Sequence, residues 1–239
     1  MISIIITNFN KGNYLLKTLE SCRDQFHKKF EVILFDDNST DHSIKIIKKF
    51  IKKNNKMKII LLNRKGNKFF DNCYNQISAI NYCVKYVSGE YISLLDADDF
   101  FRNSKLKTIN DKIDMTQKKI IYNSYYILKN NNFHSNRRHF LNRKFIWPIF
   151  PPTSCITVEK KLFKRALKKI SFKKYSSCWL DFRLAVYFSK YHSKEILYLK
   201  KNLTIYRKNI GGNDLKYSNI FSFSFWKRKL EAIILNIKI

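Results

Sequence analysis

The chain has 239 residues, of which 45% are hydrophobic and 15% are aromatic, so it is long enough and apolar enough to bury a substantial core. This composition excludes an intrinsically disordered chain. The formal net charge of +29 indicates either an anionic partner or the amino-acid usage of AT-rich codons, and neither explanation is favoured.

Strands and helices alternate along the first half of the chain. Apolar runs at 2–6, 30–35, 57–62 and 91–95 predict four strands, and apolar residues at helical spacing predict a helix in each interval. Strands that alternate with helices in this way form a mostly parallel sheet covered on both faces. The pattern therefore predicts an α/β fold whose ligands bind beyond the carboxyl ends of the strands.

The second half of the chain is less regular. Residues 129–145 are polar, basic and weakly periodic, and we expect a mobile loop there. Helical spacing returns at 160–170 and 178–191, and residues 221–239 also predict a helix.

The helical tail has two interpretations. It either packs on the body of the protein, which we favour, or lies in the interface of an anionic membrane. In the second case the aromatic side chains that enter the lipid are Phe221, Phe223, Phe225 and Trp226. The cations that meet the head groups are then Lys227, Arg228 and Lys229.

Cysteine usage and the amino-terminal segment bear on the compartment. The five cysteines form no CxxC pair, so free thiols in a reducing compartment fit better than zinc ligands or disulfides. No basic leader precedes the first apolar run, and no stretch approaches 18 apolar residues. We expect a cytoplasmic protein, either free or peripheral on the inner face of the cell membrane.

Two acidic clusters contrast with the basic chain. Six of the 18 acidic residues fall in "DDNSTD" (36–41) and "DADD" (96–99), and each cluster directly follows a predicted strand. Carboxylates this close repel one another, and a divalent metal that also binds substrate phosphates is the simplest compensating cation. The alternative for each cluster taken alone is a turn followed by a helix N-cap.

Three segments resemble a known family when they are taken in order and at their spacing. "ISIIITNFNKGNYLLKTLES", "FEVILFDDNSTD" and "AINYCVKYVSGEYISLLDADD" are similar to the nucleotide-binding half of family 2 glycosyltransferases with the GT-A fold. The resemblance is strong over residues 2–128 and looser to about residue 213. It implies a Rossmann-like, mostly parallel central sheet with helices on both faces and a C-terminal helical extension.

The same resemblance implies a division of the chain. Residues 1–215 would form the GT-A glycosyltransferase domain, with a nucleotide-sugar-binding half at 1–128 and an acceptor-binding half at 129–215. An amphipathic C-terminal helix would follow at 216–239.

The resemblance also implies a set of donor-binding residues. Asp37 would accept a hydrogen bond from the base, Asp96 would approach the ribose, and Arg207 would clamp the diphosphate. For the segment around Arg207, an ordinary glycine turn is the equal alternative. The family's arginine before Asn81 is replaced by Ile80, so a phosphate contact that this arginine sometimes makes would be either missing or supplied by another residue. The implied nucleotide-sugar-binding residues are Thr7, Asn8, Phe9, Asn10, Asp37, Asn81, Asp96 and Arg207.

The implied catalytic groups are carboxylates. Asp98 and Asp99 would hold Mn²⁺ or Mg²⁺ on the diphosphate, and Asp181 would be the general base. In such inverting enzymes an acceptor hydroxyl attacks the anomeric carbon while the nucleoside diphosphate leaves, which needs a base on the acceptor side and positive charge on the leaving group. The alternative for Asp181 is a helix N-terminal acid or a partner for Arg183.

The function implied by the resemblance is metal-dependent glycosyl transfer in surface polysaccharide biosynthesis (lipopolysaccharide, capsule or exopolysaccharide). The donor would be a nucleotide-diphospho-sugar, with UDP favoured over GDP and dTDP, and the acceptor a glycan or a lipid-linked glycan. The rivals are a basic nucleic-acid-binding protein and a catalytically inactive glycosyltransferase-like scaffold. We expect no nucleic-acid partner, because a nucleic-acid-binding function leaves the acidic clusters unexplained. Both acidic clusters are intact, which argues against an inactive scaffold that has lost its catalytic residues.

Overall fold

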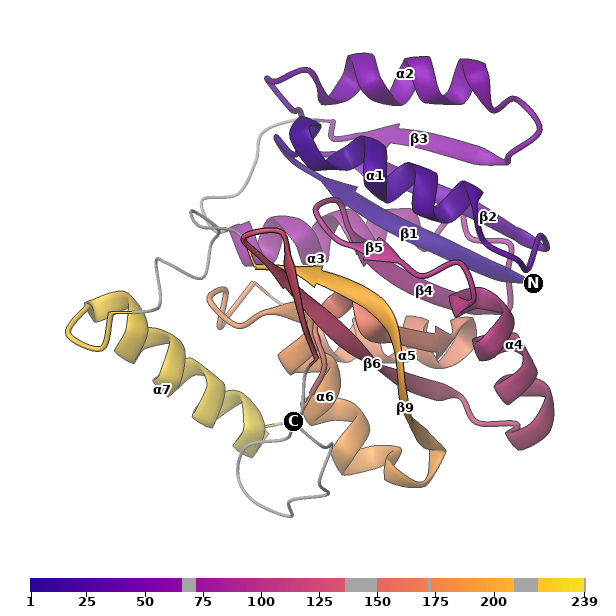
Figure 1. Ribbon diagram of the computed structural model, residues 1–239. Coiled ribbons are helices and arrows are strands. Elements are labelled where there is room, and N and C mark those ends of the chain that lie inside the picture. The colour runs from indigo at the N-terminus through magenta and orange to yellow at the C-terminus, as the bar shows by residue number, and fades with distance from the viewer. Residues whose placement is uncertain (66–71, 136–149, 172, 209–218, 239) are drawn as a thin grey trace.

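One sheet runs through both halves of the chain. The computed structural model describes residues 1–65, 72–135, 150–171, 173–208 and 219–238. Nine strands in these ranges form a sheet in the order β3-β2-β1-β4-β8-β6-β9-β5, with β7 paired to β6. Helices lie on both faces of this sheet (Figure 1).

The first half of the chain forms the parallel part of the sheet. Its strands are β1 (Ile2–Asn8), β2 (Phe30–Asp36), β3 (Ile59–Asn63) and β4 (Tyr91–Asp96), and each neighbouring pair is parallel. The intervening helices are α1 (Gly12–Arg23), α2 (Ser43–Lys53) and α3 (Asn72–Cys83). The predicted alternation of strands and helices is confirmed.

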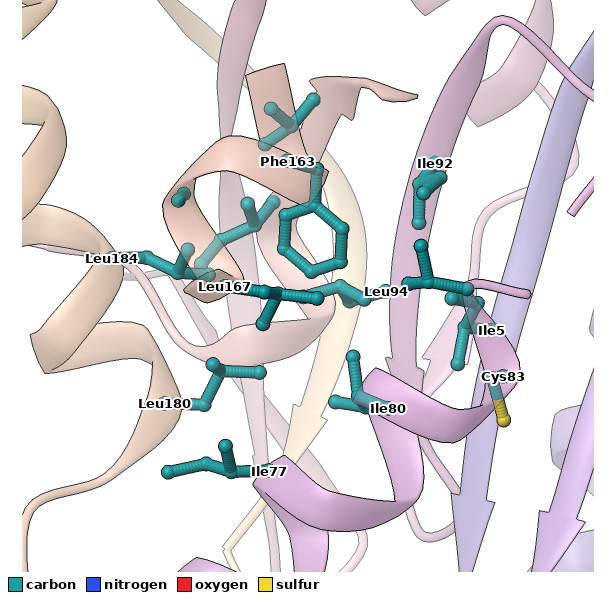
Figure 2. Close-up of a cluster of buried hydrophobic side chains, with 14 of the residues drawn as sticks. Ile5, Ile77, Ile80, Cys83, Ile92, Leu94, Phe163, Leu167, Leu180 and Leu184 are labelled. Carbon is teal, nitrogen blue, oxygen red and sulfur yellow. The ribbon is translucent and has the colours of Figure 1, made fainter. Parts of the chain in front are cut away.

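Apolar side chains of the central strands pack into two hydrophobic clusters, one on each face of the sheet. Along β1, Ile4 and Ile6 point to the cluster under α1, α2 and α4, and Ile5 points to the cluster under α3, α5 and α6. A strand buried on both faces needs apolar residues at every position, which explains the continuous apolar run. Figure 2 shows the second cluster, with residues that include Ile5, Ile77, Ile80, Leu94, Phe163, Leu167, Leu180 and Leu184.

The second half of the chain makes the sheet mixed. β8 pairs antiparallel with both β4 and β6, whereas β9 runs parallel to β6 and antiparallel to β5. The strands are β5 (Phe100–Phe101), β6 (Ile120–Lys129), β7 (Asn132–Ser135), β8 (Ile156–Glu159) and β9 (Ile196–Arg207). The helices are α4 (Lys105–Thr116), η1 (Thr153–Cys155), α5 (Lys160–Ile170), α6 (Leu180–Tyr191), η2 (Ser193–Glu195) and α7 (Phe223–Lys238).

A hairpin replaces the start of the expected loop at 129–145. β6 extends to Lys129 and pairs antiparallel with β7. The two residues between them, Asn130 and Asn131, have φ angles of 49° and 62°, which suit a tight hairpin turn that asparagine tolerates well. The prediction is therefore wrong for 129–135, and residues 136–145 lie outside the described ranges.

The expected C-terminal helix is present from 223 to 238, and its first expected residues, 216–218, are outside the described ranges. Among the helices described here, none has the length and hydropathy that a bilayer crossing requires.

The buried carboxylate of Glu31 ties together the amino-terminal ends of the parallel strands. Its Oε1 accepts hydrogen bonds from Ser3 Oγ at 2.6 Å and Ser88 N at 2.7 Å, and its Oε2 accepts from Ser88 Oγ and Lys58 Nζ, both at 2.5 Å. Gly89 fits against Ser3, because an added Cβ would lie 2.6 Å from Ser3 Oγ. Burial alone would raise the pKa of Glu31, but the donors Lys58, Ser3 and Ser88 outweigh it and lower this pKa to about 2.

We predict that Glu31→Gln lowers the free energy of unfolding by about 2–3 kcal/mol at pH 7. The folded-state pKa lies below the ordinary value of 4.5, so the ionised form stabilises the fold above about pH 4.5. This stabilisation is lost as the pH falls toward 2, and the difference between wild type and variant should shrink over that interval. Urea unfolding at a series of pH values measures it. The exposed Glu90→Gln is the control, and a difference that did not vary with pH would contradict the role of the ionised form.

Candidate active site

The acidic clusters meet at the carboxyl edge of the parallel strands. In the sheet register Asn8 lies opposite Asp36, and Thr7 lies opposite Asp96. The two clusters predicted to share one edge therefore do so. The side chains within each cluster have different surroundings, and these divide them into structural and outward-facing groups.

Two acids of the first cluster build the loops themselves. Asp36 is buried and accepts hydrogen bonds from Asn8 Nδ2 at 2.7 Å, Ser39 N at 2.8 Å and Ser39 Oγ at 2.7 Å. Asp41 accepts from Gly12 N and Ser43 N, both at 2.9 Å, so one carboxylate binds the first turns of α1 and α2. Asp41 thus binds the first amide of each helix, although the N-cap positions of α1 and α2 are Lys11 and His42.

Asp37 is paired with an arginine that the sequence analysis did not select. Arg64 Nε donates to Asp37 Oδ1, Arg64 Nη2 donates to the carbonyl of Asn75 at 3.2 Å, and the guanidinium lies 5.6 Å from the centroid of the Phe35 ring. The Asp37 amide donates to the carbonyl of Asn8 at 2.8 Å, which fixes the loop. The position of Arg64 directly after the third strand was the available signal, since it puts a cation at the same edge.

The end of β1 and the loop that follows it lie beside both clusters, since β1 pairs with β2 and β4. Thr7 is half-buried, Asn8 is buried and Phe9 is exposed. Asn10 has a φ of 52°, its amide donates to Ser39 Oγ at 3.0 Å, and its side-chain oxygen accepts from Thr40 N at 2.8 Å. The loop is thus held against the first cluster, while Phe9 faces solvent.

Asp96 and Asp98 each have a partner from another element. Gln76 Nε2 of α3 donates to Asp96 Oδ1 at 2.6 Å, and Lys11 Nζ lies 2.6 Å from Asp98 Oδ2. The pKa of Asp96 is raised well above its ordinary value, first by burial and then by the charges of Asp99, Asp98 and Asp181. Gln76 and Lys11 were not among the predicted site residues. Lys11 directly follows the predicted loop of residues 7–10, and that position was the available signal.

Asp99 is turned into the protein. It is 1% exposed, its Oδ2 accepts from Ser154 Oγ at 2.6 Å, and its Oδ1 accepts from the Arg207 amide at 2.8 Å. Burial, followed by the charge of Asp98, raises the pKa of Asp99 to about 7. Both carboxylate oxygens therefore bind protein donors, which does not suit the predicted role of metal ligand.

A buried lysine, Lys105, hydrogen-bonds to residues next to Asp99. Lys105 Nζ donates to the carbonyl of Ser154 at 2.6 Å and to Thr204 Oγ1 at 3.0 Å, and it lies 3.7 Å from the centroid of the Phe101 ring. Burial lowers the pKa of Lys105 to about 7. Neither Ser154 nor Lys105 carried a recognisable signal, because their partners are distant in the sequence.

Arg207 lies at the second cluster, as predicted. Its Nε donates to the carbonyl of Asp98 at 3.0 Å, and its guanidinium lies 4.8 Å from the centroid of the Tyr14 ring and 5.7 Å from that of Phe100. The side chain is thereby held beside the acids. Residues 209–214 of the same expected segment are outside the described ranges.

Asp181 approaches the second cluster from α6. It is half-buried in the first turn of that helix, its Oδ1 accepts from the Phe182 amide at 2.7 Å, and its charge contributes to the raised pKa of Asp96. The neighbouring Arg183 is buried and donates to backbone carbonyls of the preceding segment. These carbonyls belong to Ile170, Lys174, Tyr175 and Cys178.

Asn81 does not reach the acids. It is exposed on α3, five residues and about 7.5 Å along the helix axis beyond Gln76, and on another side of the helix. The residue of α3 that binds the second cluster is Gln76, and the donor-binding role of Asn81 stays a prediction.

The donor set restricts how a divalent ion would bind. Among the described residues there is no grouping of three His, Cys, Asp or Glu side chains that would hold a metal. Asp98, whose side chain is 20% exposed, is the carboxylate of "DADD" that faces outward. This suits Mg²⁺ or Mn²⁺ only in the mode in which one or two carboxylates and the substrate phosphates share the ion.

Comparison of the sequence identifies relatives. Residues 3–185 match the family model described as Glycosyl transferase family 2. Glycosyltransferase GlyG of Streptococcus pneumoniae is 27% identical over 126 residues, which cover 53% of this chain and 39% of GlyG. The Escherichia coli protein WfaP, named as a UDP-Glc:alpha-D-GlcNAc-diphosphoundecaprenol beta-1,3-glucosyltransferase, is 32% identical over 129 residues, 54% of this chain and 47% of WfaP. Each match spans less than half the length of these relatives.

Solved structures share the fold. S. aureus TarS 1-349 in complex with UDP-GlcNAc has a TM-score of 0.70 at 20% identity and covers 99% of this chain and 66% of its own. The mannosyltransferase PcManGT from Pyrobaculum calidifontis, in complex with GDP-Man and Mn²⁺, has a TM-score of 0.62 at 13% identity, with coverage of 99% and 63%. These likenesses confirm the predicted GT-A fold.

We predict that Ser154→Ala lowers the free energy of unfolding by about 2–4 kcal/mol. The hydroxyl donates to Asp99 Oδ2 and accepts from the Asp96 amide at 3.0 Å, so its removal takes one donor from a buried carboxylate and the acceptor from a backbone amide. Urea unfolding measures the change. Ser171→Ala is a matched control, because Ser171 Oγ is buried and has no partner among the described residues, and it should alter stability by less than about 0.5 kcal/mol. Equal losses in the two variants would contradict the role of Ser154.

Proposed function

Because the chain belongs to glycosyl transferase family 2, we propose that it is an inverting glycosyltransferase that moves a hexose or related sugar from a nucleotide-diphosphate donor to a glycan or lipid-linked acceptor. The observation that carries the proposal is the edge where Asp37 pairs with Arg64, Asp98 pairs with Lys11, and Arg207 binds the carbonyl of Asp98. Alternating carboxylates and cations at the carboxyl ends of parallel strands suit a nucleoside diphosphate. Residues 1–128 form the donor half in this proposal and residues 129–215 the acceptor half.

The donor binds across the loops of the two clusters. Asp37, oriented by Arg64, accepts an N–H of the base, and the loop of residues 7–10 covers the base and ribose. Asp96, oriented by Gln76, binds the ribose. TarS was solved with UDP-GlcNAc and PcManGT with GDP-Man, which supports a nucleotide-sugar donor, and we favour UDP.

Two cationic side chains beside "DADD" are placed to neutralise the leaving diphosphate. Lys11 and Arg207 lie beside Asp98 and would bind phosphate oxygens as the diphosphate departs. Mn²⁺ or Mg²⁺, held by Asp98, would supply further neutralisation of the leaving group when bound. The Mn²⁺ in the PcManGT complex supports divalent metal use in this fold.

Asp181 is the proposed general base. It stands in the first turn of α6, in the acceptor half, and its charge is among those that raise the pKa of Asp96. There it would take the proton of the acceptor hydroxyl while that oxygen attacks the anomeric carbon opposite the leaving diphosphate. A single in-line displacement of this kind inverts the configuration.

The acceptor is proposed from the relatives. WfaP is named for a diphosphoundecaprenol-linked acceptor, which supports a lipid-linked glycan and a role in surface polysaccharide biosynthesis at the inner face of the cell membrane.

We predict that UDP and a UDP-sugar raise the melting temperature only weakly alone and more strongly with Mn²⁺, because a ligand of the folded state stabilises by mass action. Asp98→Asn should weaken the Mn²⁺-dependent binding of UDP by at least roughly 10-fold and abolish transfer. Asp111→Asn, at an exposed position of α4, is the matched control and should behave as wild type. Absence of any nucleotide stabilisation in the wild type would argue for an inactive scaffold.

We predict that Asp181→Asn reduces kcat by about 10²–10⁴-fold, since the amide cannot accept the hydroxyl proton. The dissociation constant for UDP with Mn²⁺ should stay within about twofold of wild type, because the base contacts the acceptor and not the nucleotide. Transfer kinetics and calorimetric titration separate the two effects. Full activity in Asp181→Asn would refute the assignment of the base.

A further inference from the structure

The C-terminal helix α7 has one face packed on the catalytic body. Ala232 and Leu235 are buried, in a cluster that includes Phe182 and Val186 of α6. Glu231 Oε2 accepts from the Ser177 amide at 3.0 Å and from the Ser177 hydroxyl. The packing that we favoured for the tail is therefore present, and the helix is held at one side of the molecule (Figure 1).

The opposite face of α7 carries an exposed apolar stripe. Its five side chains are between 41% and 84% exposed, and they recur at spacings of three and four residues. At 100° per residue they fall within an arc of about 80°, turned away from Ala232 and Leu235. The stripe consists of Phe223, Trp226, Leu230, Ile233 and Ile237.

Cations flank the stripe on both sides. Lys229 lies on one flank and Lys227 and Lys238 on the other, when the helix is projected at 100° per residue. Glu231 is the one acid in the sequence of α7. It accepts from Ser177 on the packed side, and its Oε1 lies 3.9 Å from Nζ of Lys227, whose side chain stays 48% exposed. Apolar side chains with lysines along both borders are the pattern of a helix that lies in a lipid interface.

We propose that the outer face of α7 binds the surface of an anionic membrane, with the stripe in the acyl boundary and the lysines at lipid phosphates. Charge complementarity selects this occupant, because a second copy would bring the lysine borders of two chains with a net charge of +29 against each other. The structure also changes the residues expected from the sequence. Arg228 lies 5.1 Å from the centroid of the Trp179 ring on the packed side, while Leu230, Ile233 and Ile237 join the lipid-facing set.

The contact would place the acceptor half beside the bilayer. α7 holds Ser177 and stacks on Trp179, and these residues lead directly into α6 and Asp181. A lipid-linked acceptor would then reach the base without leaving the membrane. This consequence rests on the proposed function, whereas the membrane contact itself does not.

Vesicle flotation of the full chain, without nucleotide or acceptor, tests the contact. We expect binding to vesicles of phosphatidylcholine with 30% phosphatidylglycerol, and weaker binding in high salt or to pure phosphatidylcholine. The triple variant Trp226→Ser, Leu230→Gln, Ile233→Gln should lose binding. The triple variant Lys227→Gln, Lys229→Gln, Lys238→Gln should bind about 100-fold more weakly. Brominated lipids should quench the fluorescence that Trp226→Phe removes.

Matched controls use other exposed residues. Lys45→Gln, Lys48→Gln, Lys52→Gln on α2 makes the same charge change, and Met115→Gln with Tyr191→Gln removes exposed apolar side chains elsewhere. Both should bind as wild type, and all variants should keep the wild-type melting temperature.

Three outcomes would overturn the proposal: no flotation of the wild type, equal losses in the α2 and α7 lysine variants, or a wild-type dimer that the stripe variant dissociates without any lipid binding. Nucleotide stabilisation is measured separately. Vesicle binding without it would refute the proposed function alone, and nucleotide stabilisation without vesicle binding would refute the membrane contact alone.

Discussion

The buried carboxylate of Asp99 is the constraint on which the geometry of the site depends. A charge that is 1% exposed is costly unless donors surround it, and here Ser154 and the Arg207 amide fill both oxygens. These donors come from η1 and from the end of β9, so one side chain ties the turn after β4 to the second half of the chain. Lys105 then binds the carbonyl of Ser154 and fixes that donor in turn. Because Asp96 and Asp98 belong to the same turn, the contacts of Asp99 also fix the backbone from which these two side chains project.

The two acidic clusters divide their carboxylates in the same way. Asp36 and Asp41 in the first cluster, like Asp99 in the second, accept hydrogen bonds from backbone amides and hold the loops in shape. Asp37 and Asp98 instead pair with long cationic side chains, Arg64 and Lys11, that can be shared with a ligand. A nucleoside diphosphate, the proposed donor, would meet ion pairs already oriented by the structural acids, which would lower the cost of ordering them.

Local sequence patterns predicted the strands that are apolar along their whole length. They did not predict strands whose pairing partners are distant in the sequence. The run Ile4, Ile5, Ile6 identifies a strand buried on both faces, whatever it pairs with. β6 and β9 form the longest pairing in the sheet, yet they are interrupted by polar residues and separated along the chain by β7, β8, α5 and α6, so no local period marks them. The site shows the same limit. The sequence places "DADD" at the ligand edge, but which acid turns inward depends on Ser154, 55 residues away, and on Arg207, 108 residues away.

The surplus of positive charge acquires meaning only where it meets exposed apolar surface. α5 is richer in lysine than α7, but its apolar side chains, such as Phe163 and Leu167, are buried in the core, so its lysines form an ordinary solvated face. α2 repeats that arrangement with Ile47 and Phe50. Codon usage accounts for lysines on all three helices equally well, yet it does not account for a second apolar face. Among these three helices, only α7 has cations that border an exposed apolar stripe, and the exposure of this stripe to water is unfavourable. An anionic lipid surface would bury the apolar side chains and pair with the lysines at the same time.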